Sequence, residues 1–212
     1  MIENKKEFKL ISKKSPKSLL PNALTIFGVC LGLSSIKFAI DLNYPMAVIA
    51  IAFAAILDTL DGRVARLVKG TSKVGKELDS LTDVISFGVA PGFIMYFWTL
   101  NEIGKFGWMF VLIYTVCCAL RLARFNLTTI EENETWKINF FEGVPSPAAA
   151  GLVLLPLILN LSGLNQFENS AIISSIAILV TSILMVSKIP TYSLKRILIP
   201  RHLTIFLLLG IG

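Results

Sequence analysis

Six apolar stretches, each close to the length of a membrane-spanning helix, recur along the chain and constrain its fold most strongly. They occupy residues 21–40, 45–62, 82–100, 106–124, 145–162 and 170–188. A helix needs about 20 predominantly apolar residues to cross the hydrocarbon core of a bilayer. Hydrophobic residues make up 54% of the chain and charged residues only 16%, a composition far too apolar for a soluble domain. We therefore expect an all-α integral membrane protein with six core transmembrane helices and a short seventh segment at 203–212.

The first residues and the rare residue types narrow the class further. Residues 1–20 are largely basic and polar and are expected to form a cytoplasmic or interfacial segment, followed by one membrane domain over 21–212. No small-residue cleavage site follows the first apolar stretch, so we expect a retained helix and not a removed signal peptide. All three cysteines lie in apolar stretches, which indicates packing and not a disulfide framework. The single histidine, His202, argues against a histidine-based triad or zinc site.

Lysine and arginine positions predict the orientation of the chain in the membrane. These residues gather in the N-terminal segment and after the second, fourth and sixth apolar stretches. The alternate connections, at 41–44, 101–105 and 163–169, contain one such residue, Lys105. Because cytoplasmic loops are enriched in these cations, we expect the N-terminus and the connection after the second stretch to be cytoplasmic. The net charge of +6 suits anionic lipid headgroups, and no nucleic-acid partner is expected.

Four aspartates flank the connection between the second and third apolar stretches. Asp58 and Asp61 are three residues apart, and Asp79 and Asp83 are four apart, so each pair lies on one face of a helix. A single aspartate at a helix end is usually a cap or an interface residue. Ionisable groups inside a membrane protein are expensive, however, and four of them in this pattern indicate a functional site.

The connection between the two pairs is expected to fold them together. It runs from residue 62 to residue 78, is short and basic, and contains Gly62, Gly70 and Gly75, which we expect to loosen it. Gly62 and Gly75 would also let the backbone approach a nucleotide closely. Arg66 and the nearby lysines are suited to a diphosphate.

Carboxylates brought this close repel one another and require cations. Two divalent cations neutralise four carboxylates, and ligands that are all oxygen suit Mg²⁺ or Mn²⁺ and not zinc. A site with two cations polarises a phosphoryl group and stabilises both the entering and the leaving oxygen. The sequence therefore predicts phosphoryl-transfer chemistry at the aspartates.

The two runs resemble the motif D-x2-D-G-x2-A-R followed by G-x3-D-x3-D of the CDP-alcohol phosphotransferase family. The matching residues are Asp58, Asp61, Gly62, Ala65, Arg66, Gly75, Asp79 and Asp83. The expected layout of six spans is also similar to that of the family. The resemblance implies transfer of the phosphatidyl group of CDP-diacylglycerol to an acceptor hydroxyl, with release of CMP. It further implies a homodimer in the cytoplasmic (inner) membrane of a prokaryote, with the active site facing the cytoplasm.

The resemblance also implies roles for individual residues. Asp58 and Asp79 would bridge two Mg²⁺ or Mn²⁺ ions, Asp61 would complete one metal site, and Asp83 the other. Asp83 would also be the general base that takes the proton of the acceptor hydroxyl. The residues implied to contact the nucleotide of the CDP-lipid are Gly62, Ala65, Arg66, Ser72, Gly75, Asn22 and Thr25.

Four further segments resemble the phosphatidylserine synthase branch of the family, which implies L-serine as the acceptor. They are residues 87–91, 118–126, 143–151 and 189–195. Arg121 and Arg124 are three apart on one expected helix face, and a guanidinium can bind the carboxylate of serine bidentately. The two arginines could equally be anchors of the cytoplasmic side, and Asn126 could contact the acceptor or cap a helix.

Other functions remain open. Glycerol 3-phosphate, inositol phosphate or choline could be the acceptor, and Arg121, Arg124 and Lys137 could supply the cations that a phosphorylated acceptor needs. An intramembrane prenyltransferase also holds a diphosphate with aspartate-rich motifs, but those motifs lie far apart in the chain. A divalent cation transporter would place its carboxylates near the midplane of the membrane, whereas these map to helix ends.

Overall fold

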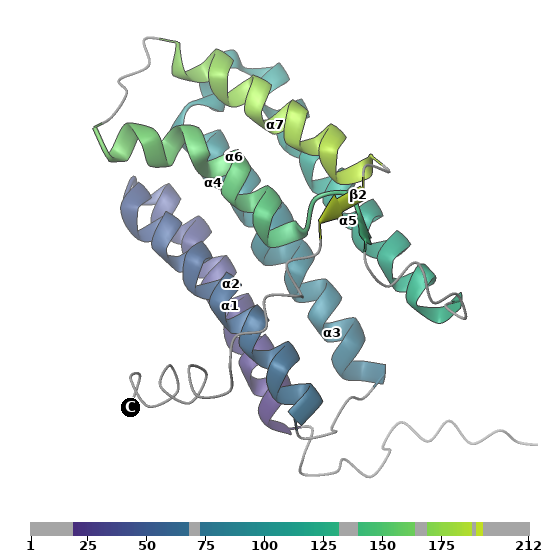
Figure 1. Cartoon of the computed structure of the whole chain (residues 1–212). Helices are drawn as coiled ribbons and strands as arrows, with labels where there is room; N and C mark the ends of the chain where they lie inside the picture. Colours follow the sequence, from purple (N-terminus) through teal and green to yellow (C-terminus); the bar gives the residue numbers. More distant parts are fainter. Residues whose placement is uncertain (1–18, 68–72, 132–139, 164–168, 188–189, 193–212) are drawn as a thin grey trace, which may run out of the picture.

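The computed structural model describes residues 19–67, 73–131, 140–163, 169–187 and 190–192, and they form a bundle of long helices (Figure 1). The helices are α1 (Leu19–Ile40), α2 (Tyr44–Leu67), α3 (Lys73–Asp83), α4 (Ala90–Trp98), α5 (Lys105–Glu131), α6 (Ser146–Leu161) and α7 (Ser170–Val186). A π-helix, η2 (Val84–Val89), joins α3 to α4, and a 3₁₀ turn, η3 (Leu100–Ile103), precedes α5. Two short strands, β1 (Phe140–Glu142) and β2 (Pro190–Tyr192), pair antiparallel, with Phe141 opposite Thr191.

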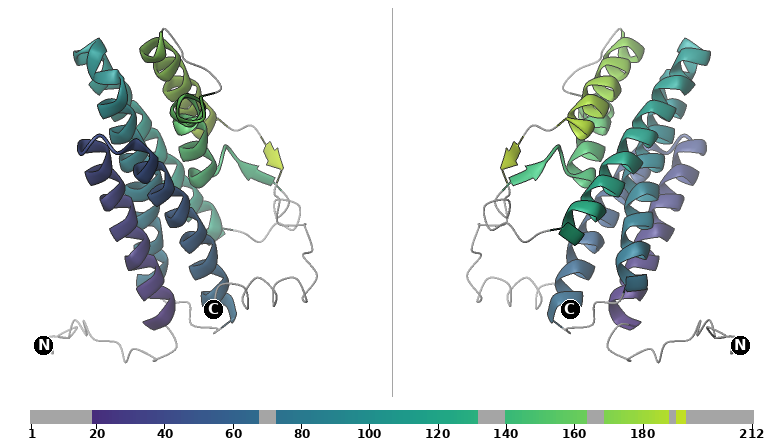
Figure 2. Two further views of the ribbon diagram at one scale, coloured as in Figure 1. Left: turned by 90° about the vertical axis from the view of Figure 1, so that its left-hand side faces the viewer. Right: turned by 90° about the vertical axis from the view of Figure 1, so that its right-hand side faces the viewer.

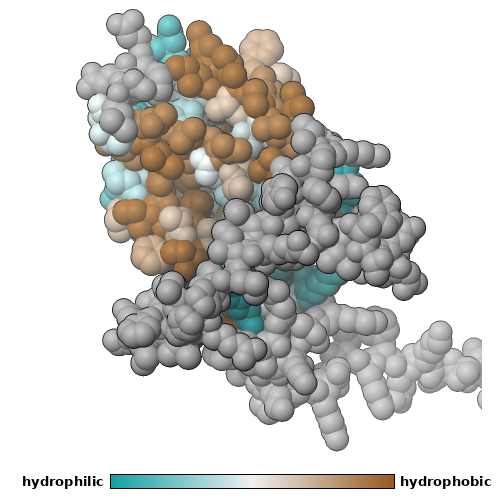
Figure 3. Space-filling model, viewed as in Figure 1, coloured by the Kyte–Doolittle hydropathy of each residue, from teal (hydrophilic) through white to brown (hydrophobic). Residues whose placement is uncertain are grey.

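Within the described residues, four helical segments are long and apolar enough to cross a membrane. They are Asn22–Ile40, Tyr44–Val64, Val74–Trp98 and Lys105–Asn126. The surface seen in Figure 3 is largely hydrophobic over the upper part of the bundle. These features confirm an all-α integral membrane protein. Helices α6 and α7 are apolar but shorter, with 16 and 17 residues, so the count of six spans stays a prediction. The predicted segment 203–212 lies outside the described residues.

Two helices extend well beyond the apolar stretches that mark them. Helix α2 continues to Leu67 and α3 begins at Lys73, so only residues 68–72 separate them. The prediction that Gly62 and Gly75 loosen the connection was therefore wrong, because both lie inside helices, and Gly70 lies outside the described residues. Hydropathy marks only the apolar part of a helix. A glycine inside a helix costs about 1 kcal/mol relative to alanine, which tertiary packing readily overrides.

The π-helix η2 lies at the centre of the bundle. It packs against α1 and α2 on one side and against α5 and α6 on the other. Helix α1 runs beside α2, and α5 runs beside α7, as the two views of Figure 2 also show. The fully buried residues Phe87, Ala90, Ile94 and Tyr114 form the middle of the hydrophobic core, at the junction of η2, α4 and α5. The residue that directly precedes η2 is Asp83, so this core fixes where the last of the four aspartates lies.

Candidate active site

Three of the four aspartates meet between α2 and α3. Asp58 and Asp61 lie about one turn apart in the C-terminal half of α2, and Asp79 lies one turn before the end of α3. One carboxylate oxygen from each of these three residues lies within 4.8 Å of the other two. The sequence prediction that the two pairs fold together is therefore confirmed for these three side chains.

Asp83 joins the cluster from the end of α3. Its carboxyl group lies within hydrogen-bonding reach of the carboxyl group of Asp58. Its Oδ1 atom is buried and has no hydrogen-bond partner among the described residues. A buried oxygen without a partner is costly, and in a native protein it is explained by a water, an ion, strain or a catalytic role. Since the donors are carboxylate oxygens only, the residues present fit a hard divalent cation such as Mg²⁺ or Mn²⁺.

Thr25 reaches the cluster from α1. Its Oγ1 donates a hydrogen bond of 2.8 Å to Oδ2 of Asp61, and both side chains are buried. A hydroxyl in this position fixes the orientation of the Asp61 carboxylate. The sequence suggested Thr25 only as a nucleotide contact, and nothing in the local sequence pairs it with Asp61. Asn22, one turn earlier in α1, is half-buried.

The other predicted nucleotide contacts lie around the gap between α2 and α3. Ala65 and Arg66 belong to the last turns of α2, and Ser72 lies outside the described residues. Among the described residues, a Cβ atom at Gly62 would meet nothing within 4 Å. Packing against these residues therefore does not require glycine at position 62, and its missing side chain leaves space beside Asp61.

Arg121 is a buried cation that interacts with the carboxylate cluster through Asp83. It lies in α5 with 9% of its surface exposed, and its Nη1 donates a 2.6 Å hydrogen bond to Oγ of Ser146. Its guanidinium interacts electrostatically with Asp83, yet the two groups form no direct ion pair. Nε of Arg121 is buried and has no partner among the described residues. Two unpartnered polar atoms, one on each residue, thus occur in the same part of the bundle.

Arg124 and Asn126 have different partners from Arg121. Nη2 of Arg124 donates to the carbonyl oxygens of Val186 and Ser187, at 3.3 Å and 3.5 Å. These carbonyls end α7, where a helix lacks its own donors. Nδ2 of Asn126 donates a 2.9 Å hydrogen bond to Oγ of Ser80 in α3. These bonds of Arg124 and Asn126 join α5 to neighbouring helices.

Ser146 is a site residue that the sequence reasoning missed as an individual. It is the first residue of α6, 1% exposed, and it holds the guanidinium of Arg121. The available signal was its place between two prolines, since Pro147 at the first turn indicates a helix start at Ser146. The sequence did not indicate which residue of α5 that helix start would meet.

The fold and the cluster together define a polytopic helical membrane protein with an acidic centre suited to divalent cations. The family model for CDP-alcohol phosphatidyltransferases matches residues 18–191, and the chain belongs to this family. The resemblance inferred from the aspartate motif is thereby confirmed.

Similar proteins in three bacteria share one name, CDP-diacylglycerol–serine O-phosphatidyltransferase. The Mycobacterium leprae protein is 40% identical over 185 residues, covering 87% of this chain and 61% of its own length. The Helicobacter pylori 26695 protein is 39% identical, covering 86% of this chain and 76% of its own. The Bacillus subtilis protein is 35% identical, covering 84% of this chain and 92% of its own length. The chain thus spans less than two thirds of the mycobacterial relatives it matches.

Proposed function

We propose that this chain is a CDP-diacylglycerol–serine O-phosphatidyltransferase that forms phosphatidylserine and CMP. Family membership and the names of the relatives support the reaction. The observation that carries the proposal is that Asp83 and Arg121, whose charged groups interact beside the carboxylate cluster, each keep a buried polar atom without a partner among the described residues, Oδ1 and Nε. Together they offer an acceptor for a hydroxyl proton and a donor for a carboxylate.

The cluster would hold two divalent cations, Mg²⁺ or Mn²⁺. Asp58 and Asp79 would contact both cations, with Asp61 completing one site and Asp83 the other. When bound, the cations would polarise the phosphoryl group and stabilise negative charge on the leaving CMP. Thr25 would keep Asp61 oriented, through the hydrogen bond to its Oδ2.

Asp83 would act as the general base. Its Oδ1 would take the proton of the serine hydroxyl as the hydroxyl oxygen attacks the phosphorus of the phosphatidyl group. The new phosphorus–oxygen bond forms while the bond to the CMP phosphate breaks, so CMP leaves with the electron pair. Gly62, Ala65, Arg66, Ser72, Gly75 and Asn22 would hold the cytidine diphosphate moiety.

Arg121 would bind the carboxylate of serine. Its guanidinium interacts with Asp83, and its Nε is buried without a partner among the described residues. Ser146 would orient its guanidinium through Nη1. Serine carries its hydroxyl and carboxylate on adjacent carbons, so a base and a guanidinium in one small space suit it. The bonds of Arg124 and Asn126 to other helices favour structural roles for both.

The site would work in a homodimer with six spans per chain, in a prokaryotic inner membrane and facing the cytoplasm. The lysine and arginine pattern of the sequence supports this orientation. The diacylglycerol tails of the substrate would remain in the lipid.

The test is CMP release from CDP-diacylglycerol by purified protein with Mg²⁺ or Mn²⁺, comparing L-serine with glycerol 3-phosphate, inositol phosphate and choline. We expect release that depends on serine. Arg121→Lys should raise the KM for serine about 10-fold or more, because lysine cannot form the paired hydrogen bonds. Arg124→Lys is the matched control and should leave that KM within about twofold, since it acts on the end of α7. CMP release with another acceptor would refute serine as the acceptor. Metal binding without any CMP release would instead favour a cation transporter.

A further inference from the structure

The π-helix η2 begins directly after Asp83, and its cause can be traced to Pro91. Proline has no N–H, and its ring clashes with the carbonyl four residues earlier, which here belongs to Phe87. The backbone widens before the proline, and the N–H of Ala90 bonds to the carbonyl of Ile85, five residues back. Such π turns are rare in proteins, and those that do occur are often found at functional sites.

The π turn changes which face of the helix carries Asp83. In an uninterrupted α-helix, Asp83, Phe87, Ala90 and Ile94 would form one stripe, because they follow at intervals of four, three and four. Phe87, Ala90 and Ile94 are fully buried in the core. A π turn holds more residues than the 3.6 of an α turn, so it rotates the residues before it relative to those after it. Asp83 can therefore reach Asp58 while the other three residues stay in the core.

Tyr114 supplies the donor that Pro91 lacks. Its hydroxyl donates a 2.7 Å hydrogen bond to the carbonyl oxygen of Phe87, and its side chain is fully buried in α5. One turn further along α5, Cys118 lies so close to η2 that a Cβ atom at Gly88 would be 3.1 Å from its Sγ. This face of α5 thus supports the π turn by one hydrogen bond and one close contact.

We propose that Tyr114 is a positioning residue that holds η2 in its π form and thereby directs Asp83 into the carboxylate cluster. The proposal rests on the proposed function of Asp83 as a metal ligand and general base. Tyr114 does not touch the reacting groups. It acts through the backbone of Phe87, four residues beyond Asp83.

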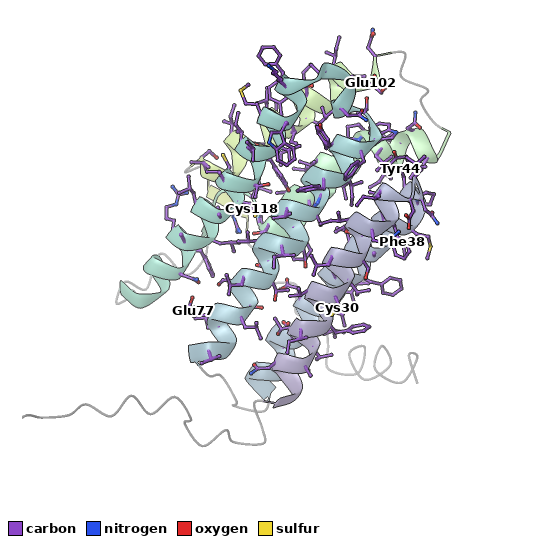
Figure 4. The ribbon with its side chains drawn as sticks, turned by 180° about the vertical axis from the view of Figure 1, so that it is seen from behind. Cys30, Phe38, Tyr44, Glu77, Glu102 and Cys118 are labelled. Atoms are coloured by element: carbon purple, nitrogen blue, oxygen red, sulfur yellow. The ribbon has the colours of Figure 1, made fainter. Side chains whose placement is uncertain are left out.

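The first test compares Tyr114→Phe with Tyr44→Phe. Tyr44 is a matched control because its hydroxyl donates a 2.9 Å bond to the carbonyl of Phe97, at the far end of the same continuous helix. Figure 4 shows Tyr44 at the end of the bundle opposite Glu77 of α3. Tyr114→Phe should lower kcat about 10- to 100-fold with little change in the KM for CDP-diacylglycerol, since a small displacement of a catalytic group has effects of this size. Tyr44→Phe should keep kcat within about twofold, as expected for a bond remote from the chemistry.

The second test uses Pro91→Ala, alone and combined with Tyr114→Phe. The new N–H at position 91 offers the Phe87 carbonyl an ordinary α-helical donor. The double variant should regain the Tm that Tyr114→Phe loses and should not regain kcat. Pro91→Ala alone should have a lower kcat than the wild type and an unchanged Tm. Recovery of both Tm and kcat in the double variant, or normal kcat in Tyr114→Phe, would overturn the proposal.

Binding of Mn²⁺, measured by electron paramagnetic resonance without substrates, separates this proposal from the proposed function. Weaker Mn²⁺ binding by Tyr114→Phe than by Tyr44→Phe is expected, because Asp83 would be turned from the cluster. If the wild-type protein releases no CMP with any acceptor, the proposed reaction fails, and this comparison still decides the role of Tyr114. Equal Mn²⁺ affinities of the two variants would overturn that role.

Discussion

Asp83 lies where the carboxylate cluster, the guanidinium of Arg121 and the π-helix meet. Asp83 ends α3, and its neighbours come from two other helices, Asp58 from α2 and Arg121 from α5. Thr25 of α1 donates a hydrogen bond to Asp61, and Ser146 of α6 accepts one from Arg121. At the residue scale the site is therefore defined by a few side-chain hydrogen bonds between helices.

Replacing Asp83 by asparagine tests its proposed role as the general base. The amide keeps the size of the side chain but cannot accept the hydroxyl proton, so turnover should fall about 100-fold or more. Binding of CDP-diacylglycerol, measured by calorimetry in detergent, should be largely retained. Turnover near that of the wild type would show that another group is the base.

Replacing Thr25 by valine tests whether the hydroxyl of Thr25 orients the carboxylate of Asp61. Valine has nearly the same shape but lacks the hydroxyl that donates to Oδ2. The Mg²⁺ concentration for half-maximal CMP release should rise about 10-fold, the lower end for loss of a residue that orients a metal ligand. Thr59→Val is the control, because Thr59 is exposed and its hydroxyl donates to the carbonyl of Ala55 in its own helix. An equal effect of both substitutions would contradict the assignment.

At the element scale, the close packing of α1 on η2 positions the helices that carry the site. A Cβ atom at Gly32 would lie 2.5 Å from Oγ of Ser86 and 3.0 Å from its Cα. Oγ of Ser86 also bonds to the carbonyl of Gly28 at 3.3 Å, so α1 and η2 are joined directly. On the opposite side, Arg124 and Asn126 join α5 to the end of α7 and to α3.

Gly32→Ala should therefore destabilise the bundle. The added methyl group meets backbone as well as a side chain, and overpacking of this kind costs about 1–3 kcal/mol. Thermal unfolding in detergent should show a lower Tm. Gly151→Ala in α6 is the control, because a Cβ atom there meets nothing within 4 Å, and the better helix propensity of alanine should leave Tm equal or slightly higher. A Tm unchanged by Gly32→Ala would show that α1 can move away from η2.

At the scale of the whole molecule, the two ends of the bundle carry different residues. Glu77 in α3 lies toward one end, and Tyr44 and Glu102 lie toward the other, as Figure 4 shows. Edge-to-face aromatic contacts of Trp108 with Phe93 and Tyr96 join α4 to α5. Tryptophan and tyrosine are enriched where a helix meets the membrane surface.

The predicted orientation can be tested with single cysteines in a background without Cys30, Cys117 and Cys118. Glu77→Cys and Glu102→Cys are a matched pair, because both glutamates are exposed. A membrane-impermeant maleimide should label Glu77→Cys only in inside-out vesicles and Glu102→Cys in intact spheroplasts. The reverse pattern would place the aspartate cluster on the outer side of the membrane.

The sequence alone determined the class of fold and the identity of the acidic cluster. Apolar runs near the length of a membrane span require helices, since a bilayer leaves no other way to satisfy backbone groups along a single run. The spacings of three and four place Asp58 with Asp61 and Asp79 with Asp83, because neighbours on a helix face are set by local geometry alone. Both inferences depend on interactions within one segment of chain.

The tertiary structure decided which residues meet across helices. It separated Arg121 from Arg124, paired Thr25 with Asp61, and brought Tyr114 to the carbonyl of Phe87. It also showed that Gly62 and Gly75 lie inside helices that outlast their apolar stretches. These features depend on the rotation and register of each helix against its neighbours, which packing between distant segments fixes and local sequence patterns do not contain.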